Sequence, residues 1–333
     1  MEKKGNRRLF STVLFLAILV LAVYIRQPGF LFKTKYRDIY FIWVEGERIA
    51  SGVNPYERVR ESDMVHNEKY PTYLPPIYLF TGLLVWLGMD SFPLFLFSWR
   101  ILILGFDLAV GIFLFYYCRR REREAAGLFA AFFWFFSRWN LYVWEIGNTE
   151  SIILFLMILS IFLWEKKPLA AGLLFGGALG LKHFGIVFLP VLLAHSKDTR
   201  DGLKRLCYVM IIPVASSLPF FLGSPEGFTK AMLFSVVRGA SSHMMEDAKS
   251  IRILLGESGW GPRIFLFLAF VLYWIAAIRE KWNLWLSAAL AFALFLSFNL
   301  ILFTQYFVWV LPFGCLFLAD ANPIEHSRKA GET

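Results

Sequence analysis

Residues 92–118 read FPLFLFSWRILILGFDLAVGIFLFYYC, and RRRER follows at 119–123. The apolar run is longer than the roughly 20 residues with which a helix crosses the hydrocarbon of a bilayer. Because lysine and arginine are enriched in cytoplasmic loops, the basic cluster indicates the inner side of a membrane. This stretch therefore predicts both a transmembrane helix and its orientation.

The same pattern of an apolar run followed by a short charged segment recurs along the chain. Hydrophobic residues make up 58% of the sequence and charged residues 18%, against about half and about a quarter in soluble domains. We therefore expect an all-α, polytopic membrane protein that forms a single domain over residues 1–333, with about ten spans. The net charge of +9 falls in clusters between the runs, as the positive-inside bias predicts, so we expect no nucleic-acid partner.

The two ends of the chain are both predicted to lie in the cytoplasm of a multi-pass cell-membrane protein. A basic segment precedes the apolar run Leu9–Ile25, and Tyr24–Pro28 offers no small-residue cleavage site, which favours an uncleaved signal-anchor. Arg328 and Lys329 lie in the C-terminal tail. The apolar segment Ile77–Leu87 is short, and a crossing there would place residues 119–123 outside. We therefore predict a partial or interfacial helix for it.

Two polar stretches are predicted to lie outside, a first outer loop at 26–76 and a second at 223–261. The first contains an amphipathic pattern that predicts a helix lying in the plane of the interface. Asp38 and Glu45 are seven residues apart and hence on its polar face. Asp38 falls in the first turn, where a carboxylate is favoured by the helix dipole. It could equally be a general base that deprotonates an acceptor hydroxyl, and the residues alone leave both roles open.

Several charged residues fall within or between the apolar runs, where they are costly and commonly mark ion pairs or sites. For Arg100 and Asp107 an ion pair with neighbouring helices is favoured over catalysis. Lys182 lies between two short helices expected within Leu169–Ala194. It could neutralise a lipid phosphate or extend to an interface, while His183 is typical of a turn.

The second outer loop supplies two further cations. Arg238 and Arg252 are candidate phosphate ligands, because guanidinium groups bind phosphate oxygens well. The three cysteines are far apart and suggest no disulfide framework. No cluster of histidine and cysteine indicates a transition metal.

A series of short motifs, in a fixed order along the chain, resembles the GT-C superfamily of membrane glycosyltransferases. Within it, the resemblance is to the catalytic subunits of glycosylphosphatidylinositol mannosyltransferase I. The motifs are Tyr36-Arg-Asp38-Ile-Tyr40, Gly52-Val-Asn-Pro-Tyr56, Tyr73-Leu-Pro-Pro76, Asp107-Leu-Ala, Gly147-Asn148-Thr-Glu150-Ser151, Lys182 before Leu189-Pro190, and Thr304-Gln305-Tyr306-Phe307-Val-Trp309. Together they cover roughly residues 36–312.

The resemblance implies roles for residues at these motifs. Asp38 would be the catalytic base, and the expected substrate-binding residues are Asn148, Glu150, Lys182, His183, Arg238, Arg252, Gln305 and Tyr306. The family's loop motif is Asp-x-Asp, but its second position here is Tyr40. This departure weakens the case for a bound metal, so no cofactor is predicted with a defined site, although a divalent cation is compatible with the family.

The predicted function is transfer of a sugar, with mannose favoured, from a polyprenyl- or dolichyl-phosphate donor to an acceptor hydroxyl of a glycan or lipid. The reaction would take place at the outer face of the membrane. The alternatives are a transporter or flippase that uses the same intramembrane charges as a pathway, and a structural partner subunit. The enzymatic reading requires Asp38, the turn at 147–151, Lys182 and the second outer loop to converge on a common hollow.

Overall fold

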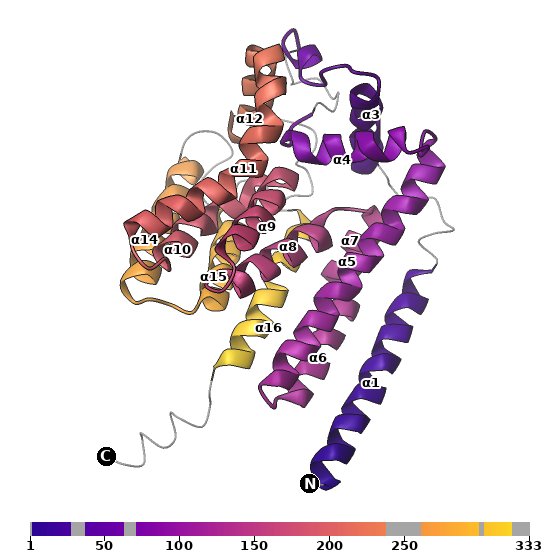
Figure 1. Cartoon of the computed structure of the whole chain (residues 1–333), viewed down its shortest axis with the longest axis vertical. Helices are drawn as coiled ribbons and strands as arrows, with labels where there is room; N and C mark the ends of the chain where they lie inside the picture. The colour runs from indigo at the N-terminus through magenta and orange to yellow at the C-terminus, as the bar shows by residue number, and fades with distance from the viewer. Residues whose placement is uncertain (1, 28–36, 63–70, 238–260, 300–302, 322–333) are drawn as a thin grey trace.

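The computed structural model describes residues 2–27, 37–62, 71–237, 261–299 and 303–321, and within these ranges the chain is helical and contains no strand (Figure 1). The α-helices are α1 (Glu2–Arg26), α3 (Arg37–Ala50), α4 (Pro75–Trp86), α5 (Phe92–Arg120), α6 (Glu124–Phe136), α7 (Arg138–Ile146), α8 (Glu150–Leu163), α9 (Pro168–Leu181), α10 (Leu189–Ala194), α11 (Thr199–Gly223), α12 (Pro225–Val237), α14 (Gly261–Arg279), α15 (Leu284–Phe298) and α16 (Leu311–Asp320). Three 3₁₀ helices accompany them in these ranges: η1 (Glu57–Val59), η2 (His183–Phe188) and η4 (Thr304–Trp309). The predicted all-α fold is confirmed.

Three helices among the described residues are long and apolar enough to cross a membrane. They comprise Asn6–Arg26, Phe92–Arg120 and Thr199–Gly223. Helices α7 and α8 pass the same test together but meet at a bend of 119°. These helices fit a membrane protein, whereas the count of about ten crossings stays a prediction, because several other apolar helices, such as α4 and α9, are shorter than one full span.

The apolar stretch from Leu128 to Trp144 is divided between two helices. Helix α6 ends at Phe136, and Ser137 adopts an extended conformation with φ −61° and ψ 138°. The hydroxyl of Ser137 then accepts a hydrogen bond from the backbone N–H of Asn140, which caps the start of α7. A capping serine therefore breaks the run at a point that its hydrophobicity does not reveal.

The long helices α1, α5 and α6 lie side by side (Figure 1). The rings of Phe15 on α1 and Phe115 on α5 stack with centroids 4.0 Å apart. A second group is formed by α8, α9 and α11, where Gly176 of α9 lets the backbone of α11 approach closely. A Cβ atom at Gly176 would lie 2.2 Å from the carbonyl oxygen of Val209.

The basic cluster at 119–123, which was predicted to be cytoplasmic, contacts the end of α16 and helix α1. Asp320 at the end of α16 pairs with Arg121 at 2.6 Å and accepts a hydrogen bond from Asn283 at 3.2 Å. Arg119 donates to the hydroxyl of Thr12 in α1 at 2.8 Å. The contacts agree with a shared side for these segments, and the identity of that side stays a prediction.

The described parts of the two predicted outer loops lie against each other. The side chain of Asn54 donates to the carbonyl of Phe220 at the end of α11, with a distance of 3.1 Å. The Tyr56 and Phe228 rings have centroids 4.9 Å apart. Lys230 on α12 donates to the carbonyl of Arg60 at 3.3 Å. These contacts bring the described parts of both segments to one region, and their outer location stays a prediction.

The short helix α4 packs against α3 in this region (Figure 1). The Thr81 hydroxyl of α4 donates to the carbonyl of Ile42 on α3, and a Cβ atom at Gly46 would lie 2.7 Å from that hydroxyl oxygen. With 12 residues, α4 is about 18 Å long, which is shorter than the hydrocarbon layer of about 30 Å. Its length agrees with the partial helix predicted for Ile77–Leu87.

Candidate active site

A buried ion pair joins two of the predicted site residues. The Nζ atom of Lys182 lies 2.6 Å from Oε1 of Glu150, and the exposed fractions of the two side chains are 9% and 0%. Such a pair is held together strongly, because either charge alone would be expensive in a low-dielectric interior. The sequence suggested both residues, but only the fold brings them into contact.

Each partner sits at a break between helices. Helix α7 ends at Ile146, and Gly147 caps it with a φ of +69°, a left-handed conformation that favours glycine. Trp99 donates its indole N–H to the carbonyl of Gly147 at 3.0 Å, and the side chain of Asn148 accepts from the backbone N–H of Thr149 at 2.8 Å. The chain then reverses into α8, which begins at Glu150. These bonds fix the carboxylate at the start of that helix.

Lys182 follows α9 in an extended conformation, with φ −160° and ψ 115°, before η2 begins at His183. Three glycines in the last nine residues of α9 favour close packing with its neighbours, and a Cβ atom at Gly180 would lie 2.5 Å from the ring of Pro76. The break therefore directs a lysine into the protein instead of along the helix. This arrangement confirms the two short helices expected within Leu169–Ala194.

Two aromatic rings of η4 lie beside Lys182, and a ring of η2 stacks on one of them. The Nζ atom of Lys182 is 5.3 Å from the centre of the Tyr306 ring and 5.4 Å from that of Trp309, distances at which a cation is attracted to an aromatic ring. Trp309 stacks on Phe184 with centroids 3.4 Å apart and on Tyr306 at 4.4 Å. Gln305 is buried beside them. Three motifs that are distant in the sequence thus meet at one place.

Asp38 lies in the first turn of α3 with its side chain exposed. The apolar face of the same helix, including Ile39 and Trp43, belongs to a hydrophobic cluster with Trp144 and Ile152, which flank the turn that carries Glu150. The base proposed from the sequence and the buried ion pair are therefore attached to one packed unit. The catalytic role of Asp38 stays a prediction.

The remaining predicted site residues have different positions. His183 is half-buried at the start of η2. Arg238 and Arg252 lie outside the described residues. Tyr40, which replaces the second aspartate of the family's loop motif, packs edge-on against Phe92 with centroids 5.1 Å apart. An aromatic contact thus occupies the position where the family has a carboxylate.

The polar residues at membrane depth have structural partners. The prediction of an ion pair for Asp107 is confirmed, because Arg26 lies 2.8 Å from its carboxylate. Arg100 donates to the carbonyl of Glu145 at 3.0 Å and lies 5.1 Å from the ring of Trp144. Arg26, which the sequence analysis placed at the start of the first outer loop, is the buried last residue of α1.

A second carboxylate on α3 was not among the predicted site residues. Glu45 is buried and pairs with Arg58, and Arg48 lies 3.6 Å from it. Burial raises the pKa of Glu45, and the two arginines oppose that rise. The seven-residue spacing from Asp38 placed Glu45 on a polar helix face, but it gave no sign that Arg58 would cover it.

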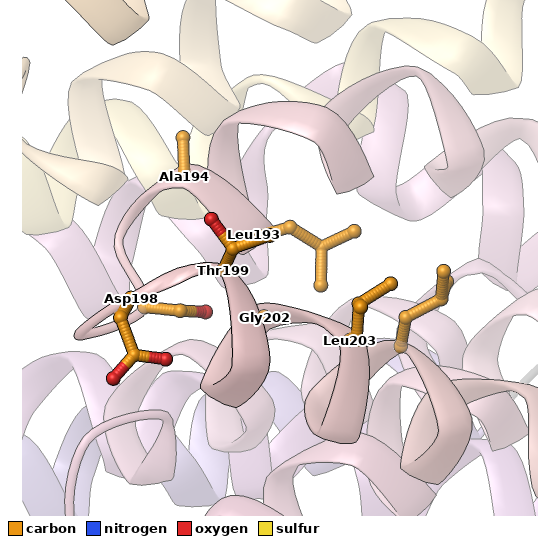
Figure 2. A pocket seen from close by; sticks show the side chains of 8 residues that line it. Leu193, Ala194, Asp198, Thr199, Gly202 and Leu203 are labelled. Carbon is orange, nitrogen blue, oxygen red and sulfur yellow. The ribbon is translucent and has the colours of Figure 1, made fainter.

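A pocket of about 430 Å³ lies at the turn between α10 and α11 (Figure 2). Leu193, Asp198, Thr199 and Leu203 are among the residues that line it. Its lining includes none of the residues predicted for the site. We therefore assign it no part in sugar transfer. Among the described residues, no group of three or more His, Cys, Asp or Glu is arranged to hold a metal ion.

Comparison with known proteins identifies the family. The sequence profile of glycosyltransferase family 87 matches residues 72–318, which is most of the chain. The chain belongs to glycosyltransferase family 87. It is a membrane protein and a glycosyltransferase, and the matched range includes Glu150, Lys182 and the aromatic residues of η4.

Individual relatives agree with the resemblance noted in the sequence. The chain is 23% identical to GPI mannosyltransferase 1 of Saccharomyces cerevisiae over 87% of its own length and 74% of the yeast protein. It is 24% identical to the GPI alpha-1,4-mannosyltransferase I catalytic subunit of Danio rerio over 91% and 78% of the two chains. It is 25% identical to GPI mannosyltransferase 1 of Trypanosoma brucei brucei over 90% and 73%.

Proposed function

We propose that this family 87 glycosyltransferase moves mannose from a polyprenyl- or dolichyl-phosphate donor to a hydroxyl of a glycan or glycolipid acceptor at the outer face of the membrane. The observation that supports this most directly is the buried Glu150–Lys182 pair within the aromatic wall of Tyr306 and Trp309. A lysine provides a point charge for a phosphate, and aromatic rings suit a sugar face. The mannosyltransferase names of several relatives favour mannose.

Lys182 would stabilise the leaving group. In transfer from a lipid-phosphate sugar, the bond between the anomeric carbon and the phosphate oxygen breaks, and the lipid phosphate leaves with the electron pair. Negative charge therefore grows on the phosphate in the transition state, and a fixed cation in a water-poor site lowers its energy. A phosphate is already a good leaving group, so charge neutralisation is needed more than acid catalysis.

Asp38 would act on the acceptor. Its carboxylate takes the proton from the acceptor hydroxyl while the hydroxyl oxygen attacks the anomeric carbon, and the configuration at that carbon inverts. The exposed position of Asp38 in the first turn of α3 is compatible with access to a second substrate. Proton removal by a positioned base contributes about 10²–10⁴-fold to such reactions.

The outer-face orientation and the multi-pass topology with cytoplasmic termini belong to the same proposal. They are supported by the contacts of the basic cluster, including Arg119 and Arg121, with α1 and the end of α16. Glu150 and Lys182 come from turns that the charge pattern places on the opposite side.

The test uses purified protein in detergent with a short polyprenyl-phosphate mannose and a mixture of glycolipid acceptors. We expect a mannosylated product with inverted configuration, and we expect Asp38→Asn to reduce its rate of formation by about 10²-fold or more. Glu47→Gln, on the same helix, is the matched control and should keep activity. A wild-type rate for Asp38→Asn would refute the role of Asp38. A protein that moves the lipid across vesicles without changing it would instead be a flippase.

A further inference from the structure

We propose that Glu150 is a built-in counter-ion which the phosphate of the donor displaces from Lys182. Glu150 then sets both the affinity for the lipid phosphate and the rate of its release. This inference rests on the proposed function, because it assigns a role within the same donor site. It extends that function by giving the carboxylate a task of its own.

The burial of the pair makes a counter-ion necessary. Lys182 and Glu150 are 2.6 Å apart, and their side chains are 9% and 0% exposed. A buried ammonium without an anion would lose its hydration, and the attraction of neighbouring rings would offset only part of that loss. In the donor-free protein Glu150 supplies that anion, and in the donor complex a phosphate oxygen can supply it.

Two polar atoms beside the pair still lack partners. Within the described part of the chain, Oε2 of Glu150 and the indole N–H of Trp309 are buried and form no hydrogen bond. Native proteins leave few buried polar atoms unpaired, and such atoms often lie where a ligand binds. A sugar hydroxyl can donate to the carboxylate oxygen, and a phosphate or hydroxyl oxygen can accept from the indole. A hexosyl phosphate carries both kinds of group.

The position of Glu150 in its helix suits an exchange of anions. It is the first residue of α8, a helix of 14 residues, and the N-terminus of a helix favours negative charge through its free N–H groups. Either the carboxylate or a phosphate is therefore stabilised there. Because the glutamate side chain has several rotatable bonds, rotation can withdraw its carboxylate from Lys182 while the backbone stays in place.

The exchange has a consequence for turnover. A lysine with no internal competitor would hold the lipid phosphate product as firmly as the donor. Return of Glu150 to Lys182 offsets part of that attraction and favours release. Glu150 therefore weakens binding of the lipid phosphate and speeds release of the product. Removal of the Glu150 carboxylate should raise the affinity for the lipid phosphate and lower the rate of multiple turnovers.

The experiment measures binding of farnesyl phosphate, with farnesol as the uncharged comparison, to purified full-length protein by calorimetry. We expect Glu150→Gln to bind farnesyl phosphate on the order of tenfold more tightly than wild type, a factor equal to about 1.4 kcal/mol. Farnesol binding should stay unchanged. Lys182→Gln should bind farnesyl phosphate more weakly than wild type. Glu145→Gln, with an exposed side chain on the neighbouring turn, is the control and should match wild type.

A second variant protects the test against misfolding. Glu150→Asp keeps the charge but shortens the side chain, so it should weaken the ion pair and raise the affinity for farnesyl phosphate by a smaller factor. Equal or weaker binding by folded Glu150→Gln and Glu150→Asp would overturn the inference while leaving the proposed function intact. If the wild-type protein binds farnesyl phosphate no more tightly than farnesol, the proposed phosphate site at Lys182 is wrong, and the proposed function is wrong with it.

Discussion

The guanidinium of Arg26, at the end of α1, lies 2.8 Å from the carboxylate of Asp107 in the middle of α5, and the two side chains are 0% and 3% exposed. Asn140 of α7 donates to the other carboxylate oxygen at 2.8 Å, and Arg26 donates to the carbonyl of Phe135 at 3.0 Å. This network connects four helices. It also fixes the start of α7, the helix that leads to the turn carrying Glu150.

Asp107→Ala should strongly destabilise the protein, because it leaves Arg26 buried without its anion. Loss of one partner of a buried pair costs about 3–5 kcal/mol. The double variant Arg26→Met/Asp107→Leu should recover much of that loss, since no charge is left behind. Unfolding in mixed micelles with an increasing fraction of denaturing detergent measures the stability of the single and the double variant. An Asp107→Ala protein as stable as the exposed-site control Asp90→Ala would contradict the structural role.

Gly176→Ala and Gly177→Ala form a matched pair on adjacent positions of α9. A Cβ atom at Gly176 would lie 2.2 Å from the carbonyl oxygen of Val209, whereas at Gly177 the nearest atoms are 3.8 Å away. The first substitution should therefore lower stability by about 1–3 kcal/mol through overpacking. The second should be neutral or slightly stabilising, because alanine favours helix. Thermal unfolding in detergent compares them, and equal midpoints would show that α9 and α11 are not in close contact.

The pH dependence of stability should carry a contribution from Glu45. Burial holds its pKa above the ordinary value of 4.5 in the folded protein, so folding favours the protonated form. The stabilisation is complete below the unfolded pKa and is lost as pH rises through the folded pKa. Wild type should therefore lose stability relative to Glu45→Gln as the pH rises above about 4.5.

The measurement for Glu45 is the slope of the melting temperature against pH. The melting temperature at a single pH is not sufficient, because Glu45→Gln also removes the ion pair with Arg58 and so shifts the melting temperature at every pH. Glu61→Gln, at a position with an 85% exposed side chain, is the control and should leave the slope as in wild type. A slope that Glu45→Gln also leaves unchanged would show that Glu45 does not titrate in this way.

The orientation of the chain is open to labelling with a membrane-impermeant maleimide. In a variant without native cysteines, we expect Glu145→Cys to react in intact cells and Lys166→Cys to react only after the membrane is opened. Both side chains are exposed, so accessibility depends on the side of the membrane. The expectation follows from the positive-inside bias at residues 165–167. The reverse labelling pattern would show that the predicted inner and outer sides of the protein are exchanged.

The sequence by itself determined the helical membrane class and the order of the family motifs. Those properties are local. Hydrophobic run length follows from the thickness of a bilayer, and a short motif such as 147–151 or 304–309 is legible without its neighbours. The sequence also indicated that Asp107 would need a cation.

Only the tertiary structure decided which groups meet. Arg26 pairs with Asp107, Glu150 pairs with Lys182, and Arg58 covers Glu45, although each partner is remote in the chain. Such contacts depend on how helices pack, and packing depends on shape across many residues, such as the close approach that Gly176 permits. The break at Ser137 has the same origin, because a capping hydroxyl and a buried network outweigh the continuous hydrophobic pattern around them.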